Sequence, residues 1–280
     1  MLQNRSILKK IGALFAAAVF LSSAACKGPV DVFSLPTEIT ARSPSPVAEN
    51  PRNLHVATYN IKHGSMVGYD FSLIGQKIAE LDIDIIGLQE VENKTERVGY
   101  QDVLQELSQT SGCPYYAFAK AIDFEEGEYG LAVLSRYEII RFDTILLYSE
   151  GTEQRVLGHA VICVGDQLID FFVTHLTFGK NTNIRKKQLE GIAQELARTE
   201  QYIITGDFNT SDYQEFEPFD GATPLNNFDQ YFETFYPYEL GPDNIILSCA
   251  WKSLSVQMEN FEYSDHYMLH AVVEREDNDA

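Results

Sequence analysis

The chain has 280 residues, of which 45% are hydrophobic and 12% aromatic, so it can build one sizeable core. This composition excludes disordered, collagen-like and disulfide-dominated chains. The formal net charge is −20, from 21 Lys and Arg against 41 Asp and Glu. Binding to a polyanion depends on basic groups that displace counterions, so this charge disfavours a general nucleic-acid scaffold. It does not exclude an enzyme that meets phosphate through a divalent metal, which reverses the field at its own site.

The first 26 residues have the layout of a secretory signal. Basic residues precede an uncharged apolar run over 11–21, which is too short to cross a bilayer. Small residues before Cys26 resemble a bacterial lipobox, although Ser23 stands where a branched aliphatic residue is usual. We predict export, removal of residues 1–25 and a lipid on Cys26 that anchors the protein to a bacterial envelope membrane. Ordinary cleavage, giving a periplasmic or secreted protein, is the alternative.

Residues 27–52 hold five of the ten prolines and little periodic apolar pattern. This composition is typical of an extended segment rather than of core. The sequence therefore predicts a lipid-attached, Pro-rich tether over 26–52. The rest of the chain, 53–280, shows no second linker and is predicted to be one domain.

Short apolar and aromatic runs, bounded by turn residues or charges, predict most of the secondary structure. The predicted strands are 54–60, 83–89, 115–119, 131–135, 139–147, 160–164, 168–175, 202–207, 244–248 and 267–273. Apolar residues at helical spacing predict helices at 71–81, 102–109 and 184–198. Several consecutive strands leave no room for a helix between them. The pattern therefore predicts an α/β fold with mixed sheets and helices outside.

Polar side chains stand at the ends of several otherwise apolar strands. They are Asn60, Glu90, His175, Asp207 with Asn209, Asp243, and Asp265 with His266. A charged group at the mouth of a buried strand costs several kcal/mol if it is dry and unpaired, so these groups should converge on something that compensates them. A hard divalent cation, bound by oxygen ligands, is the simplest candidate for the group that compensates them.

The segments T-Y-N, L-Q-E, T-H-L, G-D-F-N, D-x-I and S-D-H occur in this order from about Asn53 to the C-terminus. In this order they resemble the endonuclease/exonuclease/phosphatase family, which includes DNase I-like enzymes. The resemblance implies a four-layered α/β/β/α sandwich of two mixed sheets with helices on the outer faces. It also implies a metal-dependent hydrolase that acts on phosphoric ester bonds.

The resemblance implies a metal site that holds Mg²⁺ or Mn²⁺. Glu90 resembles the metal-ligating glutamate, with Asn60 beside it and Asp265 as a further ligand on the metal side. Glu92 is a neighbouring acid, but we expect it in the loop after the strand, where it fits the motif less well. Taken alone, Asn60 would be interpreted as a turn residue. Only the other polar residues at strand ends indicate that it belongs to a site.

The same resemblance implies an acid–base group. Asp207 resembles the aspartate that orients or deprotonates the attacking water, and Asn209 the amide that holds a phosphoryl oxygen. His266 resembles the catalytic histidine, with Asp243 as its carboxylate partner. A carboxylate fixes the tautomer of an imidazole and raises its pKa, so that the imidazolium can stabilise charge on phosphate. Which of Asp207 and His266 acts as the base is left open.

His175 occupies the position of a second histidine found in nuclease and sphingomyelinase relatives, and Glu128 resembles its acidic partner. A lone histidine is more often a hydrogen-bonded interior residue, so this role depends on Glu128. Arg97 and Arg155 are candidate substrate contacts. For both arginines, an ordinary solvated surface is the better default.

The substrate is less well defined by the sequence. Only 33 residues separate Asn209 from Asp243, which leaves little room for insertions that grip duplex DNA. We therefore expect a phosphodiester or phosphomonoester on a small molecule, sugar or lipid headgroup. Nucleic acid enters only as an alternative substrate, for an exported DNase or RNase. A catalytically silent binding protein on the same scaffold is the rival from another class.

Overall fold

The computed structural model describes residues 34–36, 39–41, 51–179 and 182–276. These residues fall within the compact unit Val32–Ala280. The signal segment, the cleavage site and Cys26 lie outside the described residues, so their predictions stand as predictions.

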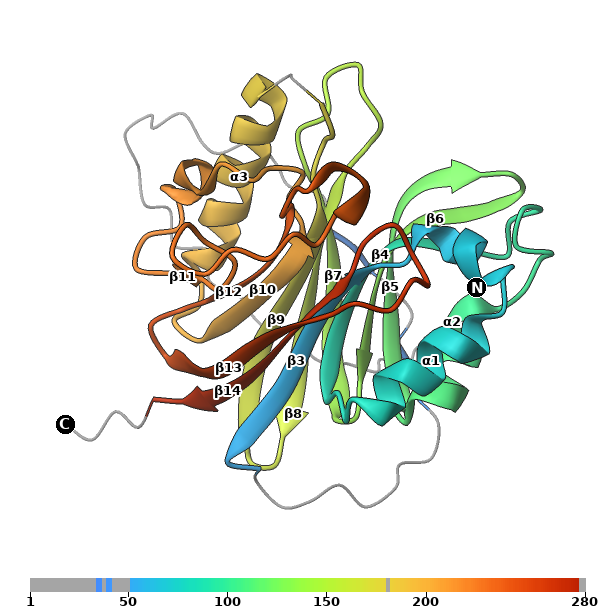
Figure 1. The fold of residues 1–280 in the computed structure, drawn as a ribbon, viewed down its shortest axis with the longest axis horizontal. Coiled ribbons are helices and arrows are strands. Elements are labelled where there is room, and N and C mark those ends of the chain that lie inside the picture. Colours follow the sequence, from blue (N-terminus) through green and yellow to red (C-terminus); the bar gives the residue numbers. More distant parts are fainter. Residues whose placement is uncertain (1–33, 37–38, 42–50, 180–181, 277–280) are drawn as a thin grey trace, which may run out of the picture. The chain divides into compact units, whose positions relative to one another are not determined.

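Two seven-stranded mixed sheets make up the body of the molecule (Figure 1). The first sheet has the order β1 (Ser34–Pro36), β7 (Glu138–Leu146), β8 (Val156–Val164), β9 (Gln167–His175), β10 (Tyr202–Asp207), β12 (Asp243–Leu247) and β11 (Thr223–Pro224). The second sheet has the order β13 (Trp251–Glu259), β14 (Met268–Arg275), β3 (Asn53–Asn60), β4 (Ile85–Asn93), β6 (Gly127–Ser135), β5 (Tyr115–Phe124) and β2 (Ile39–Ala41). One neighbouring pair in each sheet is parallel, β9–β10 and β3–β4.

Helices cover the outer faces of the sheets. They are α1 (Phe71–Glu80), α2 (Val103–Ser111) and α3 (Thr182–Leu196), with 3-10 turns η1 (Lys62–Val67), η2 (Tyr213–Phe216) and η3 (Tyr236–Tyr238). The side chains of Asp70 and Asp102 accept hydrogen bonds from backbone N–H groups in the first turns of α1 and α2, which explains where these helices begin. No helix in the described part of the chain is both long and apolar enough to cross a membrane.

Three buried clusters hold the layers together. The largest lies between the sheets and includes Phe171, Ile203 and Leu269. A second joins α1 and α2 to the outer face of the second sheet, and a third joins α3 to the outer face of the first. This arrangement confirms the predicted four-layered α/β/β/α sandwich.

All ten predicted strands and all three predicted helices are present, most with ends shifted by a few residues. The strand β13, an edge strand that carries polar side chains, and the two-residue β11 were not predicted from the sequence. Residues 34–36 and 39–41 were predicted to be tether, but they pair with β7 and β5 at the outer edges of the sheets. An edge position tolerates Pro36, because a strand there needs only one row of hydrogen bonds.

Candidate active site

Three polar side chains meet at one edge of the first sheet because of strand register. Asp207 ends β10 and pairs with His175 at the end of β9 and with Asp243 at the start of β12. Paired residues in adjacent strands point to the same side of a sheet, so all three side chains share one face. All three are buried. The sequence analysis placed these residues at strand ends, and the register brings them together.

Asn60 joins this group to the second sheet. Its Nδ2 donates to Oδ2 of Asp207 at 3.0 Å and to Oε1 of Glu90 at 3.1 Å. Its Oδ1 accepts a hydrogen bond from the backbone N–H of Lys62 at 3.0 Å, and the residue is 1% exposed. One buried amide therefore fixes two carboxylates that come from different sheets.

Glu90 reaches the site through a break in its strand. The pairing of β4 with β6 shifts between Leu88 and Val91, and Glu90 has a left-handed φ of 56°. Such a bulge re-aims a side chain that strict alternation would send elsewhere. Burial raises the pKa of the Glu90 carboxyl, but His63, His175, Asn60 and His266 together outweigh it and lower the pKa to about 2. Glu90 is therefore a carboxylate at neutral pH.

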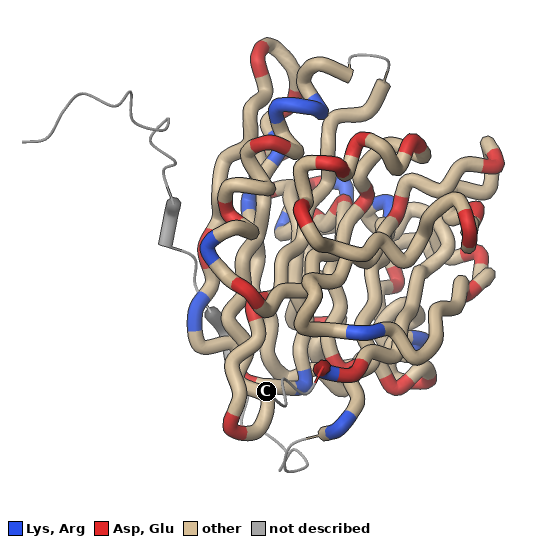
Figure 2. The backbone as a smooth tube through the Cα atoms, turned by 90° about the vertical axis from the view of Figure 1, so that its left-hand side faces the viewer, with Lys and Arg blue, Asp and Glu red and all other residues tan. Residues whose placement is uncertain are grey.

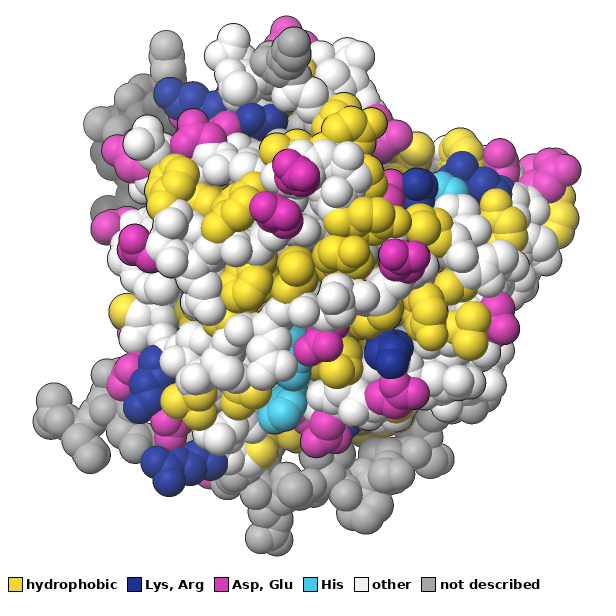
Figure 3. Space-filling view, viewed as in Figure 1, with side chains coloured by type: hydrophobic (Ala, Val, Ile, Leu, Met, Phe, Trp, Pro, Cys, Tyr) yellow, Lys and Arg dark blue, Asp and Glu magenta, His cyan; other side chains and the backbone are white. Residues whose placement is uncertain are grey.

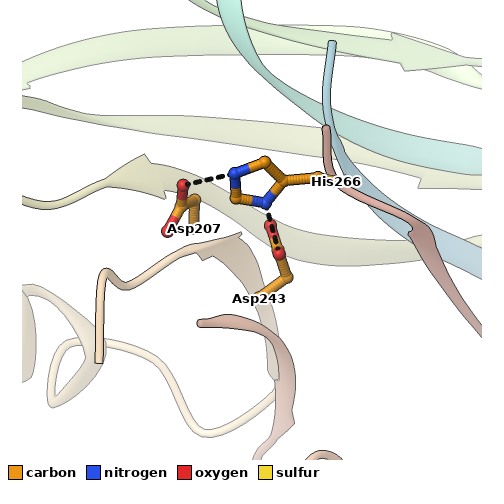
Figure 4. A group of neighbouring side chains, drawn as sticks. All are labelled: Asp207, Asp243 and His266. Atoms are coloured by element: carbon orange, nitrogen blue, oxygen red, sulfur yellow. Dashed lines mark hydrogen bonds and ion pairs between the residues drawn. The ribbon is translucent and has the colours of Figure 1, made fainter. Parts of the chain in front are cut away.

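His266 lies between two carboxylates (Figure 4). Its Nδ1 is 2.7 Å from Oδ2 of Asp243, and its Nε2 is 3.7 Å from Oδ2 of Asp207. Burial lowers the pKa of the imidazole, but Asp243 and Asp207 outweigh it and raise the pKa to about 10. These three residues lie close enough to share a cation. An imidazole that holds its proton to high pH is a poor ligand, so we regard them as an acid–base group.

The pKa of the Asp207 carboxyl is raised as well. Burial and the neighbouring charge of Asp243 raise this pKa. His266, Asn60 and the backbone N–H of Asn209 lower it, but by less. That N–H donates to Oδ1 of Asp207 at 2.9 Å, and Asn209 has a left-handed φ of 52°. The side-chain Nδ2 of Asn209 donates to the carbonyl of Leu176 at 2.9 Å. A raised pKa suits a carboxylate that accepts a proton near neutral pH.

His175 is held by an arginine, not by the predicted acid. Arg155 donates from its guanidinium to Nδ1 of His175 at 3.1 Å, and Nε2 of His175 lies 3.5 Å from Asp207. Arginine can only donate, so Nδ1 is an acceptor and the ring proton is on Nε2. Burial and Arg155 lower the pKa of His175 well below its ordinary value, which keeps the ring neutral.

The prediction that Glu128 partners His175 is therefore wrong. The carboxylate of Glu128 is half-exposed and pairs with Lys120 at 3.2 Å. Its neighbour Tyr129 faces the site instead, where burial and the charge of Glu90 raise its pKa and where it contacts Arg155. Successive residues of a strand point to opposite faces, so the two cannot both reach the site.

The contacts of Arg97 stabilise the fold. It forms an ion pair with Glu92, which is fully buried, and its guanidinium lies 4.9 Å from the ring centre of Phe124. Glu92 belongs to β4, not to a loop, and also accepts a hydrogen bond from Thr95. The arginine therefore neutralises an acid that would be costly to bury alone.

The turn after β3 supplies two residues that the sequence analysis missed. Nζ of Lys62 lies 2.7 Å from Oδ2 of Asp265, and Nδ1 of His63 lies 3.8 Å from Oε2 of Glu90. Their adjacency to Asn60 in the sequence was the available signal. The metal-side role of Asp265 stays a prediction, since its contact in the structure is with Lys62.

Comparison with known proteins decides the family. A model of the endonuclease/exonuclease/phosphatase family matches residues 57–266, which include every residue of the site. The chain belongs to this family. A search of curated protein sequences gives no significant match.

Several solved structures share the fold at low sequence identity. An endonuclease/exonuclease/phosphatase from Beutenbergia cavernae is 17% identical, with a TM-score of 0.67 over 80% of this chain and 72% of that chain. The human nocturnin catalytic domain, which has a bound sulfate, is 18% identical, with a TM-score of 0.64 over 86% and 98%. A mannosyl-6-phosphatase from Bacteroides thetaiotaomicron is 19% identical, with a TM-score of 0.58 over 79% and 99%.

Proposed function

We propose that this protein is a divalent-metal-dependent phosphoesterase. The observation that carries the proposal is the position of Asn60, whose amide ties Glu90 to the group of Asp207, His266 and Asp243. Ionised carboxylate, amide and protonated imidazole thereby lie around one point. Hydrolysis of a phosphoester requires these functions together: charge neutralisation, orientation of water and proton transfer.

The carboxylate of Glu90 fits a hard divalent cation. It is ionised at neutral pH, and Asn60 fixes its position by donating from Nδ2 to Oε1. Oxygen ligands of this kind suit Mg²⁺ and Mn²⁺. When bound, such a cation neutralises a nonbridging phosphoryl oxygen and makes attack by an anionic nucleophile easier.

The acid–base roles follow from two upward pKa shifts, which leave the two groups in different protonation states at neutral pH. His266 holds its proton at neutral pH, so we assign it the stabilisation of negative charge that develops on phosphate. Asp207, whose pKa is raised, is the group that takes the proton of the attacking water. Arg155 and the Nε2–H of His175 provide further donors toward phosphoryl oxygen.

Two observations support a small organic ester as the substrate. Acidic residues are spread over the loops of the molecule (Figure 2), and they repel a polyanion. Hydrophobic side chains also gather in a band across one face (Figure 3). Phe235 stacks on His266 with ring centres 4.6 Å apart, and Tyr238, which is 69% exposed, packs on Phe235. The packed rings of Phe235 and Tyr238 form an apolar surface that suits the organic part of an ester.

One of the structures that share the fold is a mannosyl-6-phosphatase, so the fold is compatible with a substrate of this class. Export and a lipid on Cys26 would place the enzyme on a bacterial envelope, where it would act on an external phosphoester. A nuclease of the same family is the second candidate. We rank it lower because of the acidic loops.

Hydrolysis assays test the proposal. We expect turnover of p-nitrophenyl phosphate or its bis ester with Mg²⁺ or Mn²⁺, and its loss on addition of EDTA. A substrate panel of sugar phosphates, inositol phosphates, sphingomyelin and nucleic acids then identifies the class. Cleavage of duplex DNA that collapses steeply with added salt would favour the nuclease. Turnover that EDTA does not affect would contradict the proposed metal dependence, and no turnover of any ester would favour the silent binding protein.

A further inference from the structure

The start of η1, directly after β3, places a histidine beside the proposed metal-binding glutamate. Three consecutive residues are left-handed, Lys62 with φ 45°, His63 with φ 46° and Gly64 with φ 75°. A Cβ at Gly64 would lie 2.5 Å from a ring carbon of Phe71. Left-handed non-glycine residues cost about 1–3 kcal/mol each and persist where the surrounding structure enforces them, often at functional sites. The turn therefore holds His63 in a backbone conformation that costs free energy.

His63 and Glu90 face each other without a good hydrogen bond. Nδ1 of His63 lies 3.8 Å from Oε2 of Glu90, which exceeds hydrogen-bond length. The other oxygen of Glu90, Oε1, accepts from Asn60. In the part of the chain that the structure describes, Glu90 is the one ion-pair partner of His63, whose side chain is 17% exposed. Nδ1 of His63 and Oε2 of Glu90 thus lie next to each other without a direct hydrogen bond.

We propose that Nδ1 of His63 and Oε2 of Glu90 bind the same divalent cation, and that the site consequently prefers a first-row transition ion to Mg²⁺. The inference rests on the metal dependence in the proposed function. Two atoms that each lie about 2.1 Å from one ion can be at most about 4.2 Å apart. The separation of 3.8 Å satisfies this limit.

The preference for a transition ion over Mg²⁺ follows from the chemistry of the ligands. Mg²⁺ takes oxygen ligands almost exclusively and gives up water reluctantly. Transition ions accept imidazole readily, and their affinity for sites with nitrogen ligands rises along the series from Mn²⁺ toward Cu²⁺. A nitrogen ligand therefore strengthens binding of an ion such as Co²⁺ more than binding of Mg²⁺.

The variant His63→Asn tests this assignment. Asparagine tolerates the left-handed conformation and can still donate to Glu90, but it lacks the imidazole. The control is His55→Ala, which removes a half-buried histidine at the other end of β3. Calorimetric titration of the whole protein with Co²⁺ and with Mg²⁺ measures affinity without any substrate. Thermal unfolding of each variant checks the fold.

We expect His63→Asn to weaken Co²⁺ binding by at least about tenfold and Mg²⁺ binding by less than about threefold. The visible spectrum of bound Co²⁺ should change in this variant, and His55→Ala should match the wild type in metal affinity and in the Co²⁺ spectrum. Equal weakening for both ions, or an unchanged Co²⁺ spectrum, would show that His63 only positions Glu90 and would overturn the inference. A wild-type protein that binds neither ion would instead contradict the metal dependence of the proposed function.

Discussion

The imidazole of His266 and the carboxylate of Asp243 form a close polar contact, with Nδ1 and Oδ2 2.7 Å apart and both residues buried. The two residues come from segments 23 positions apart in the sequence. Asp243 stabilises the proton on the ring, so the pKa of His266 rises to about 10 although burial opposes it. The catalytic behaviour of the site at alkaline pH should depend on this pair.

We expect Asp243→Asn to reduce kcat by about 100-fold, because the ring loses the charge that holds its proton. The protonated ring is the active form, so activity persists below its pKa and is lost as pH rises through it. In the wild type this loss falls near pH 10, and in the variant it moves to lower pH. A pH profile of kcat measures the shift. An alkaline limb that stays in place would mean that Asp243 does not set the pKa of His266.

Asp207→Asn and His266→Ala should each lower kcat by at least about 100-fold, the usual scale for removal of an acid–base group. Asp207→Asn keeps the shape of the side chain but cannot accept a proton from water. Activity is measured with p-nitrophenyl phosphate and a saturating metal, and circular dichroism verifies the fold. If either variant keeps most of its activity, the assigned roles are wrong.

Arg155→Ala and Arg97→Ala form a matched pair with opposite expected effects. Arg155→Ala removes the donor that fixes the tautomer of His175, so we expect kcat/KM to fall by about 100-fold. Arg97→Ala leaves the buried Glu92 without its ion pair, so Tm should fall while kcat stays near the wild-type value. Kinetics and thermal unfolding of both variants check this contrast. A larger kcat loss in Arg97→Ala than in Arg155→Ala would mean that Arg97, not Arg155, serves the reaction.

Stability should fall in mild acid because of His270. This histidine is 7% exposed, and burial and the nearby His55 lower its pKa to about 4. Glu259 lies 3.9 Å from Nδ1 of His270, beyond hydrogen-bond length. Between pH 4 and the ordinary pKa near 6.5, the unfolded chain binds a proton that the folded chain does not. The free energy of unfolding therefore falls as pH falls through this window, by about 3 kcal/mol for this group.

Urea unfolding of the wild type and of His270→Phe between pH 7 and 4 measures this contribution. The phenylalanine removes the titrating group and keeps an aromatic ring in its place. The pH dependence of the variant should be shallower than that of the wild type. Parallel curves would show that His270 does not titrate as described.

Two glycines give a matched test of the contact between the sheets. A Cβ at Gly87 in β4 would lie 2.2 Å from Oγ1 of Thr205 and 2.9 Å from Cγ2 of Val173, both in the first sheet. Gly87→Ala should therefore destabilise the protein by about 1–3 kcal/mol. A Cβ at Gly191 in α3 meets no atom within 4 Å, so Gly191→Ala should stabilise the helix by up to about 1 kcal/mol. Urea unfolding compares the two, and a neutral Gly87→Ala would mean that the sheets can separate without cost.

The sequence by itself determined the layers and much of the site. Strands and helices follow from local periodicity, and the polar residues that end them, such as Asn60, Asp207 and His266, stand out against apolar runs. These features depend on neighbours in the chain, and they predict an α/β fold with mixed sheets. The four-layered sandwich and the partnership of Asp243 with His266 were expectations from the family resemblance, and the structure confirms both.

Tertiary structure decided which side chains meet. Strand register produces the bulge that turns Glu90 into the site, and it makes Arg155 rather than Glu128 the partner of His175. A left-handed turn brings His63 next to Glu90. A shift of one residue in a strand exchanges the faces of all its side chains. The sequence therefore defined the chemical groups, and the pairing of distant strands defined their partners.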